Sequence, residues 1–168
     1  MSDRIAVMHE GLVLQVDDPV GIYERPTTRF GASFIGEMNL LEADVSAKGS
    51  GRVTIDLHGA RLELPCEGRT PAVGERVCLA IRPEAIQLQG IRLGKASVSN
   101  TGDGLCLRGT LREEIYIGTD RRFVVGLDSG ETVVIRSQNS GEQAPVRASV
   151  GEPATVRCPA GSIRLLTD

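Results

Sequence analysis

The sequence predicts a mainly β protein in which about ten short strands form one or two small antiparallel barrels. Its 168 residues contain 20 Gly and 8 Pro but only two Tyr, three Phe and no Trp, which favours frequent turns over packed helices. From residue 37 onward, apolar and polar residues alternate with a period of two, the pattern of half-buried strands. Turn sequences interrupt this alternation every several residues, as they do in small barrels.

The first 36 residues are organised differently. Their expected elements are strands at 4–8 and 12–16 and helices at 19–24 and 28–35. Asp18 is a good N-cap, Pro19 suits a first helical turn, and Gly36 can close the second helix. We expect residues 1–36 to be the end of a larger unit and residues 37–168 to be the β domain.

Within residues 37–168 the alternation predicts a series of short strands. The candidates are 39–45, 51–57, 61–64, 77–81, 105–111, 123–127, 133–135, 154–158 and 162–166. Gly109 occupies an inward position of its strand, which indicates a bulge or a bend there. We expect a Gly-rich connection from residue 90 to residue 100 and a polar loop at 137–148.

Charge and hydropathy exclude several functions. The net charge is −3, and the aromatic residues after residue 36 are Tyr116 and Phe123, of which Phe123 alternates with core positions. Binders of single-stranded nucleic acid need a basic groove with stacked aromatic side chains, so we expect no nucleic-acid partner. The chain also lacks an apolar run of ~20 residues, the length that a membrane-spanning helix requires.

Residues typical of metal sites and nucleophilic catalysis are sparse. No CxxC spacing occurs among the four cysteines, which we expect to be reduced: Cys66, Cys78, Cys106 and Cys158. His9 and His58 are both expected in surface turns. Residues 90–96 resemble a phosphate-binding loop, but three residues separate its glycines where four are needed, and Ala96 replaces the required Ser or Thr. We therefore expect no catalytic, metal-binding or cofactor-binding residue in this chain, and no enzymatic activity of its own.

Several motifs occur in a definite order along the chain. They are SDRIAVM at 2–8, Gly11, Gln15, Pro19, IY at 22–23, Pro26, Phe30, FIG at 34–36, NLLE at 39–42, RPE at 82–84, IYIG at 115–118 and VGE at 150–152. In this order the chain resembles the C-terminal part of the ATP-binding subunits of binding-protein-dependent ABC importers, including their transport-associated OB-type (TOBE) domain. The stretch FIGEMNLLEADV is most similar to the spermidine/putrescine (polyamine) branch. The iron(III), sulfate, glycerol-phosphate and sugar branches are the alternatives.

This resemblance implies a regulatory, dimer-stabilising domain. No position matches the family's nucleotide-binding or catalytic motifs, so ATP and Mg²⁺ would belong to the full-length parent protein. The implied partners are an upstream ATPase domain, a second copy of the chain and the importer's transmembrane subunits. The implied location is the cytoplasmic, inner face of a bacterial membrane. A stand-alone protein that binds a small oxyanion or metabolite is the alternative.

Two pairs of residues are candidates for a regulatory or interface role. Arg82 and Glu84 flank Pro83 after a strand and could meet a partner subunit, although an ion pair or cap within the domain is the favoured interpretation. Glu113 and Glu114 could attract a cationic ligand, although a solvated face is favoured.

Two further sets of residues carry structural expectations. Arg121 and Arg122 could pair with the glutamates at 113–114 across a hairpin. The resemblance also implies that Tyr23, Phe30 and Phe34 pack the two linker helices onto the ATPase domain. In isolation this surface would be an exposed apolar patch.

Overall fold

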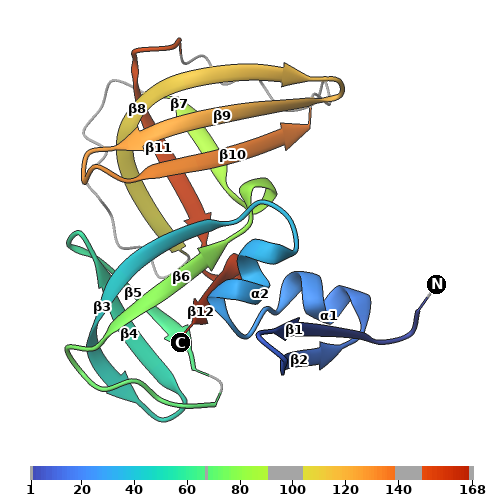
Figure 1. Cartoon of the computed structure of the whole chain (residues 1–168). Coiled ribbons are helices and arrows are strands. Elements are labelled where there is room, and N and C mark those ends of the chain that lie inside the picture. The colour runs from blue at the N-terminus through green and yellow to red at the C-terminus, as the bar shows by residue number, and fades with distance from the viewer. Residues whose placement is uncertain (1, 67, 91–103, 139–148, 167–168) are drawn as a thin grey trace.

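The computed structural model describes residues 2–66, 68–90, 104–138 and 149–166, and these form a mainly β structure (Figure 1). Its helices and strands are β1 (Ile5–His9), β2 (Leu12–Asp17), α1 (Pro19–Glu24), α2 (Arg29–Phe34), β3 (Asn39–Gly49), β4 (Arg52–Leu57), β5 (Ala60–Pro65), β6 (Arg76–Ile81), β7 (Gln87–Gly90), β8 (Gly104–Ile117), β9 (Asp120–Leu127), β10 (Thr132–Gln138), β11 (Pro153–Pro159) and β12 (Ile163–Leu166). Short 3-10 turns, η1 (Pro83–Ala85) and η2 (Ala160–Ser162), precede β7 and β12. The predicted class is confirmed.

Ten of these strands form two antiparallel five-stranded sheets. The first sheet has the order β12-β6-β3-β4-β5, and the second sheet has the order β10-β9-β8-β11-β7. In Figure 1 the second sheet lies above the first. The edge strands β5 and β12 of the first sheet also contact each other, so this sheet curls toward closure.

The two sheets exchange strands that are distant in sequence. After β6 the chain leaves the first sheet and contributes β7 to the second sheet, where β7 pairs with β11. After β11 the chain returns, and β12 pairs with β6, with Ile163 opposite Ile81. Figure 1 shows β12 reaching down beside the first sheet. Each sheet therefore contains an edge strand, β7 or β12, that the chain reaches by crossing from the other sheet. We expect the two sheets to fold as one unit.

Alternation of apolar residues builds one core that is shared by both sheets. In β4, Val53, Ile55 and Leu57 are buried while the residues between them are not, as predicted. The same cluster continues through Leu111 of β8 and Val125 of β9. Complete burial of one aliphatic side chain of this size stabilises a fold by about 1.5–3 kcal/mol, so this core is the main source of stability.

Two details of the second sheet differ from the sequence expectations. Gly109 pairs in register with Leu127, and the bulge lies further along, between Leu111 and Glu113. Gly109 is needed for a different reason, because a Cβ there would overlap the carbonyl group of Gly126. Strand β7 was not anticipated, since its four residues carry too little alternation to distinguish them from a turn. The stretch resembling a phosphate loop and the polar loop both extend into the undescribed residues 91–103 and 139–148.

The two helices form as expected from their caps. The Asp18 carboxylate accepts a hydrogen bond from the Gly21 amide at 2.8 Å, and the Thr28 hydroxyl accepts one from the Gly31 amide at 3.0 Å. Gly36 follows α2 with φ +86°, the left-handed conformation that favours glycine. We call residues 19–37, which hold both helices, the linker segment.

The linker segment packs on the outer face of the first sheet. Ala32 of α2 is fully buried against Cys78 and Ala80 of β6 and Leu166 of β12. Strand β6 is consequently buried on both faces, toward the core on one side and toward α2 on the other. The β1–β2 hairpin, by contrast, forms a two-stranded sheet of its own beyond the helices (Figure 1).

Asn39, the first residue of β3, joins the two sheets. Its side chain is buried, its amide nitrogen donates to the carbonyl oxygens of Ile81 at 3.3 Å and Val134 at 2.8 Å, and its oxygen accepts from the Val134 amide at 2.7 Å. Val134 lies on β10, the edge strand of the second sheet. One amide side chain thus pairs with both main-chain groups of Val134 on this edge strand.

We expect Asn39→Ala to lower the free energy of unfolding by about 2–3 kcal/mol, because it leaves buried main-chain groups without partners. Urea denaturation checks this value, with Lys48→Ala at the exposed end of the same strand as the control. An Asn39→Ala protein as stable as the Lys48→Ala protein would show that these hydrogen bonds contribute nothing net.

Candidate functional site

Arg82 lies at the joint between the linker segment and the sheets. It directly follows β6, and only 9% of it is exposed. One terminal nitrogen, Nη1, donates to the carbonyl oxygens of Ile35 at 2.6 Å and Glu37 at 3.3 Å, and the other, Nη2, donates to that of Tyr23 at 2.6 Å. The guanidinium also lies 3.9 Å from the centre of the Tyr23 ring. Arg82 therefore points into its own chain, where its partners are main-chain carbonyls and an aromatic ring and not the ion pair or turn cap that the sequence favoured.

Glu84 lies on the other side of Tyr23. Its carboxylate accepts a hydrogen bond from the Tyr23 hydroxyl at 2.7 Å, a contact between residues 61 positions apart in sequence. This bond, together with partial burial and repulsion by the carboxylate, raises the pKa of Tyr23. The three side chains of Arg82, Tyr23 and Glu84 thus form one cluster, although the sequence analysis had assigned them to two separate roles.

Replacing Glu84 by Gln should lower the pKa of Tyr23, because the phenolate would no longer face a carboxylate. Absorbance of the ionised phenol during an alkaline titration measures this pKa, and a Tyr116→Phe background leaves Tyr23 as the only tyrosine. Glu24→Gln, which changes an exposed carboxylate on α1, is the matched control. An unchanged Tyr23 titration in Glu84→Gln would contradict the observed hydrogen bond.

The long β8–β9 hairpin holds the second pair of candidate residues. Glu114 forms an ion pair with Arg121, whose guanidinium also lies 5.3 Å from the centre of the Tyr116 ring. The expected pairing is wrong for Arg122, which instead reaches Glu37 at 2.8 Å. Glu113 is exposed; the hydrogen bond to Glu37 raises the pKa of Arg122, and the charge of Glu113 also helps to raise it. Near its tip the hairpin exposes three large apolar or aromatic residues: Ile115, Tyr116 and Ile117.

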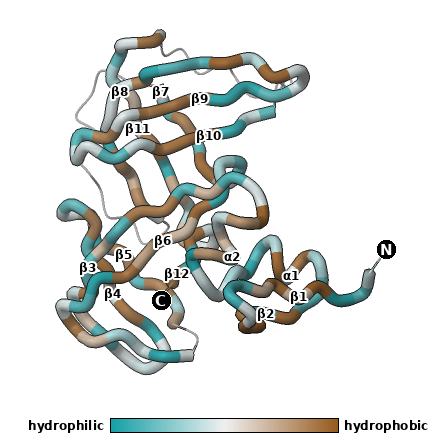
Figure 2. The backbone as a smooth tube through the Cα atoms, viewed as in Figure 1, coloured by the Kyte–Doolittle hydropathy of each residue, from teal (hydrophilic) through white to brown (hydrophobic). Residues whose placement is uncertain are grey.

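A second apolar surface lies at the N-terminal end of the structure. The rings of His9, Phe30 and Phe34 stack in a row, with centroids 4.0 Å and 5.4 Å apart, and 66% of Phe34 is exposed. Strands β1 and β2 carry brown, apolar stretches in Figure 2. The hairpin and α1 expose six further apolar residues: Ile5, Met8, Leu12, Val13, Val16 and Val20. We call these six residues and Phe34 the N-terminal apolar surface.

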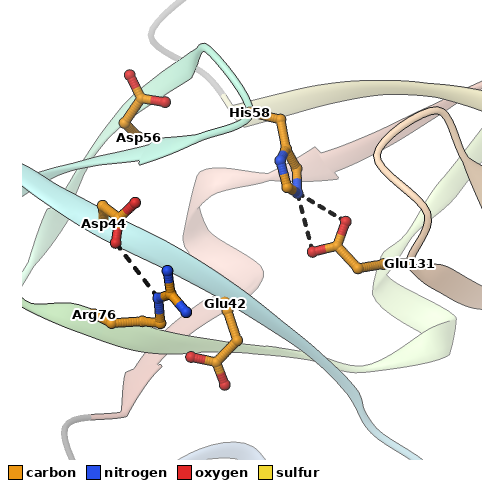
Figure 3. A pocket seen from close by; sticks show the side chains of 6 residues that line it. All are labelled: Glu42, Asp44, Asp56, His58, Arg76 and Glu131. Carbon is orange, nitrogen blue, oxygen red and sulfur yellow. Dashed lines mark hydrogen bonds and ion pairs between the residues drawn. The ribbon is translucent and has the colours of Figure 1, made fainter.

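An open pocket of about 470 Å³ lies between the two sheets (Figure 3). Its lining residues are charged or titratable: Glu42, Asp44, Asp56, His58, Arg76 and Glu131. His58, in the β4–β5 turn, points across to Glu131 in the β9–β10 turn, with Nε2 2.7 Å from one carboxylate oxygen. The sequence predicts His58 at this turn, but no local pattern predicts its partner Glu131, which lies 73 residues away.

Most carboxylates of this pocket have arginine partners. Asp44 lies 3.6 Å from Arg76, Asp56 lies 3.1 Å from Arg61, and Glu42 pairs with Arg29 of α2 at 2.5 Å. Among the described residues no group of His, Cys, Asp or Glu side chains is arranged to hold a metal ion. Burial raises the pKa of the Cys158 thiol to about 12, which leaves it protonated and unsuited to bind metal. The pocket is thus lined by paired charges, and the pair of His58 with Glu131 joins the two sheets.

The Glu131 carboxylate should make stability depend on pH. Partial burial acts to raise its pKa, but hydrogen bonds from Ser129 and His58 outweigh burial and lower it. A carboxylate with a lowered folded-state pKa stabilises the protein above its unfolded-state pKa, and this contribution is lost as the pH falls through the folded-state value. We expect Glu131→Gln to be less stable than the parent by about 0.5–1 kcal/mol near neutral pH.

Urea denaturation at about pH 6 and about pH 2 tests this expectation, because the difference should vanish once Glu131 is protonated. Glu63→Gln, which alters an exposed pair with Arg52, is the control. A Glu131→Gln deficit that persists undiminished at the lower pH would rule out the carboxylate's charge as its cause.

Two strand-exchanged antiparallel sheets with linker helices docked on one face define a β domain of the transport-associated class. The TOBE domain family model matches residues 79–166, from within β6 to the end of β12, and the chain belongs to this family. The match covers the whole second sheet and both segments that cross between the sheets. The α-helices of the described residues have six residues each, far short of the ~20 that span a membrane.

Curated relatives extend the match across the whole chain. The chain is 38% identical over 169 residues to the spermidine/putrescine import ATP-binding protein PotA of Ruegeria pomeroyi, covering 100% of this chain and 42% of that protein. It is 37% identical to PotA 1 of Pseudomonas aeruginosa, with the same coverage of both chains. The chain thus spans about two fifths of the length of these relatives, matching their C-terminal part.

A solved structure supports the fold. The cytoplasmic molybdate-binding protein ModG is similar to this chain with a TM-score of 0.60 and 17% identity, over 86% of this chain and 99% of ModG. At this identity the likeness concerns the arrangement of strands alone.

Proposed function

We propose that this chain is the C-terminal regulatory region of the ATP-binding subunit of a bacterial ABC importer for polyamines. The observation that carries this proposal is the identity of 37–38% to spermidine/putrescine import ATP-binding proteins along the entire chain. That identity includes residues 1–36, which precede the TOBE domain match and have no place in a free-standing barrel.

The N-terminal apolar surface supports a contact with an ATPase domain upstream in such a subunit. A two-stranded sheet is marginal by itself and normally needs further strands or a packed partner. Strands β1 and β2 have no other strand beside them in the described structure, and Leu12 and Phe34 are 68% and 66% exposed. We propose that Tyr23, Phe30 and Phe34 adjoin this contact, and that residues 1–36 are the end of the ATPase domain together with the linker helices that join it to the sheets.

The remaining parts of the subunit's activity lie outside this chain in the proposal. ATP and Mg²⁺ would bind to the upstream domain, and this chain would contribute no catalytic residue. The two sheets would meet a second copy of the subunit and keep two ATPase domains together as their nucleotide sites open. The importer's transmembrane subunits would place the complex on the inner face of the membrane.

A chimeric subunit tests the proposal. In it, this chain replaces the matching C-terminal part of Ruegeria pomeroyi PotA, in a strain that lacks its own PotA. We expect spermidine uptake to be restored to within about tenfold of the native level, because the N-terminal apolar surface would fit the ATPase domain. A parallel chimera with the ATP-binding subunit of a sugar importer should restore sugar uptake less well if the chain belongs to the polyamine branch.

A chimera carrying Leu12→Asp and Phe34→Asp is the matched variant, since both changes lie on the N-terminal apolar surface and spare the core. It should lose uptake, whereas Val73→Asp, at an exposed apolar residue away from that surface, should retain it. Absence of spermidine uptake from a stably expressed parent chimera would overturn the proposal. A saturable rise in the melting temperature of the isolated chain with molybdate, sulfate or phosphate would instead favour the oxyanion-binding alternative.

A further inference from the structure

The linker segment is attached to the sheets largely through its main chain. Arg82 donates to three carbonyl oxygens of this segment, those of Tyr23, Ile35 and Glu37. Arg164 of β12 donates to a fourth, that of Glu24, at 3.1 Å. These carbonyls lie at the C-terminal ends of α1 and α2, where the last turn of a helix leaves carbonyl groups unpaired. Two arginines from the sheets therefore complete both helix ends.

Arg82 is unusual because it is buried without a carboxylate partner. Among the described residues no ion pair involves it, and its Nε has no hydrogen-bond partner. A buried cation is costly unless hydrogen bonds compensate for lost water, and here main-chain carbonyls and the Tyr23 ring provide that compensation. If the linker segment moved away, Arg82 would lose all of these contacts together.

The geometry requires a planar, forked group at this position. Ile35 and Tyr23 belong to different helices, and the two terminal nitrogens of Arg82 reach one carbonyl each at 2.6 Å. A lysine ammonium is a single point charge and cannot hold both in this way. Gly36 leaves room for the fork, because a Cβ at this position would lie 3.3 Å from Nη1.

We propose that Arg82 is a positioning residue that latches the linker segment to the sheets. With the latch closed, α1, α2 and the hairpin before them move as one body with β6 and β10. With the latch open, the segment keeps its packing around Ala32 and four polar contacts at its surface: Arg29 with Glu42, Arg122 with Glu37, Tyr23 with Glu84, and Arg164 with the Glu24 carbonyl. The role of this latch rests on the proposed function: the latch couples movement of an upstream ATPase domain to the two sheets.

Amide hydrogen exchange of the 168-residue chain tests the latch without any transport assay. The reporters are the hydrogen-bonded linker amides of Ile22, Arg25, Ala32 and Ile35, with β6 amides as the internal reference. We expect Arg82→Gln to speed exchange of the linker amides about tenfold or more, in line with the loss of charge-assisted hydrogen bonds. The β6 amides should keep the protection of the parent.

Two further variants separate the fork from its charge and from simple destabilisation. Arg82→Lys keeps the charge and should behave like Arg82→Gln. Arg136→Gln removes an exposed charge whose field also acts on Tyr23, and it should behave like the parent. In a Tyr116→Phe background, acrylamide quenching of Tyr23 fluorescence should rise in Arg82→Gln and Arg82→Lys but not in Arg136→Gln.

Parent-like linker exchange in Arg82→Gln would overturn the latch, and so would equal loss of protection in the linker and in β6. Linker amides as protected in Arg82→Lys as in the parent would show that a positive charge suffices. That result would overturn the requirement for a forked guanidinium. These outcomes do not depend on spermidine uptake, so a failure of the latch is distinguishable from a failure of the proposed function.

Discussion

The structure depends on the burial of two polar side chains at a single joint. Among the described residues, Asn39 and Arg82 are the buried polar or charged ones, and they lie close together because Asn39 pairs with Ile81, the residue before Arg82. Buried polar groups must find hydrogen-bond partners, since leaving them unpaired costs more than most single contacts provide. Satisfying both therefore requires the linker segment, the first sheet and β10 to meet at one place.

Because the two sheets exchange strands and share one core, they must fold together, whereas the β1–β2 hairpin forms a separate sheet. Strands β7 and β12 cross between the sheets, so neither sheet can be completed before both are assembled. The hairpin pairs only with itself and leaves apolar residues such as Leu12 exposed. This arrangement fits the proposed function, in which the exposed hairpin contacts an upstream ATPase domain and the two sheets form one unit.

Local signals predicted most of the secondary structure. Alternation located β4 and β5 within a residue or two, and Asp18 and Gly36 marked helix ends, because these features act over a few neighbouring residues. Strand β7 escaped prediction since it is short and owes its conformation to pairing with β11. The bulge was misplaced for a related reason: the need for glycine at Gly109 comes from the close approach of Gly126 on the neighbouring strand.

The amino-acid sequence by itself determined the fold class, both helices, most of the strands and the resemblance that singled out Arg82, Glu84 and Tyr23. Only the tertiary structure decided what these side chains contact. Arg122 meets Glu37 across 85 residues, and His58 meets Glu131 across 73. Such pairs depend on the order of strands within each sheet and on the docking of one sheet against the other. Those choices are made by burial of the shared core over the whole chain, and no local pattern of residues records them.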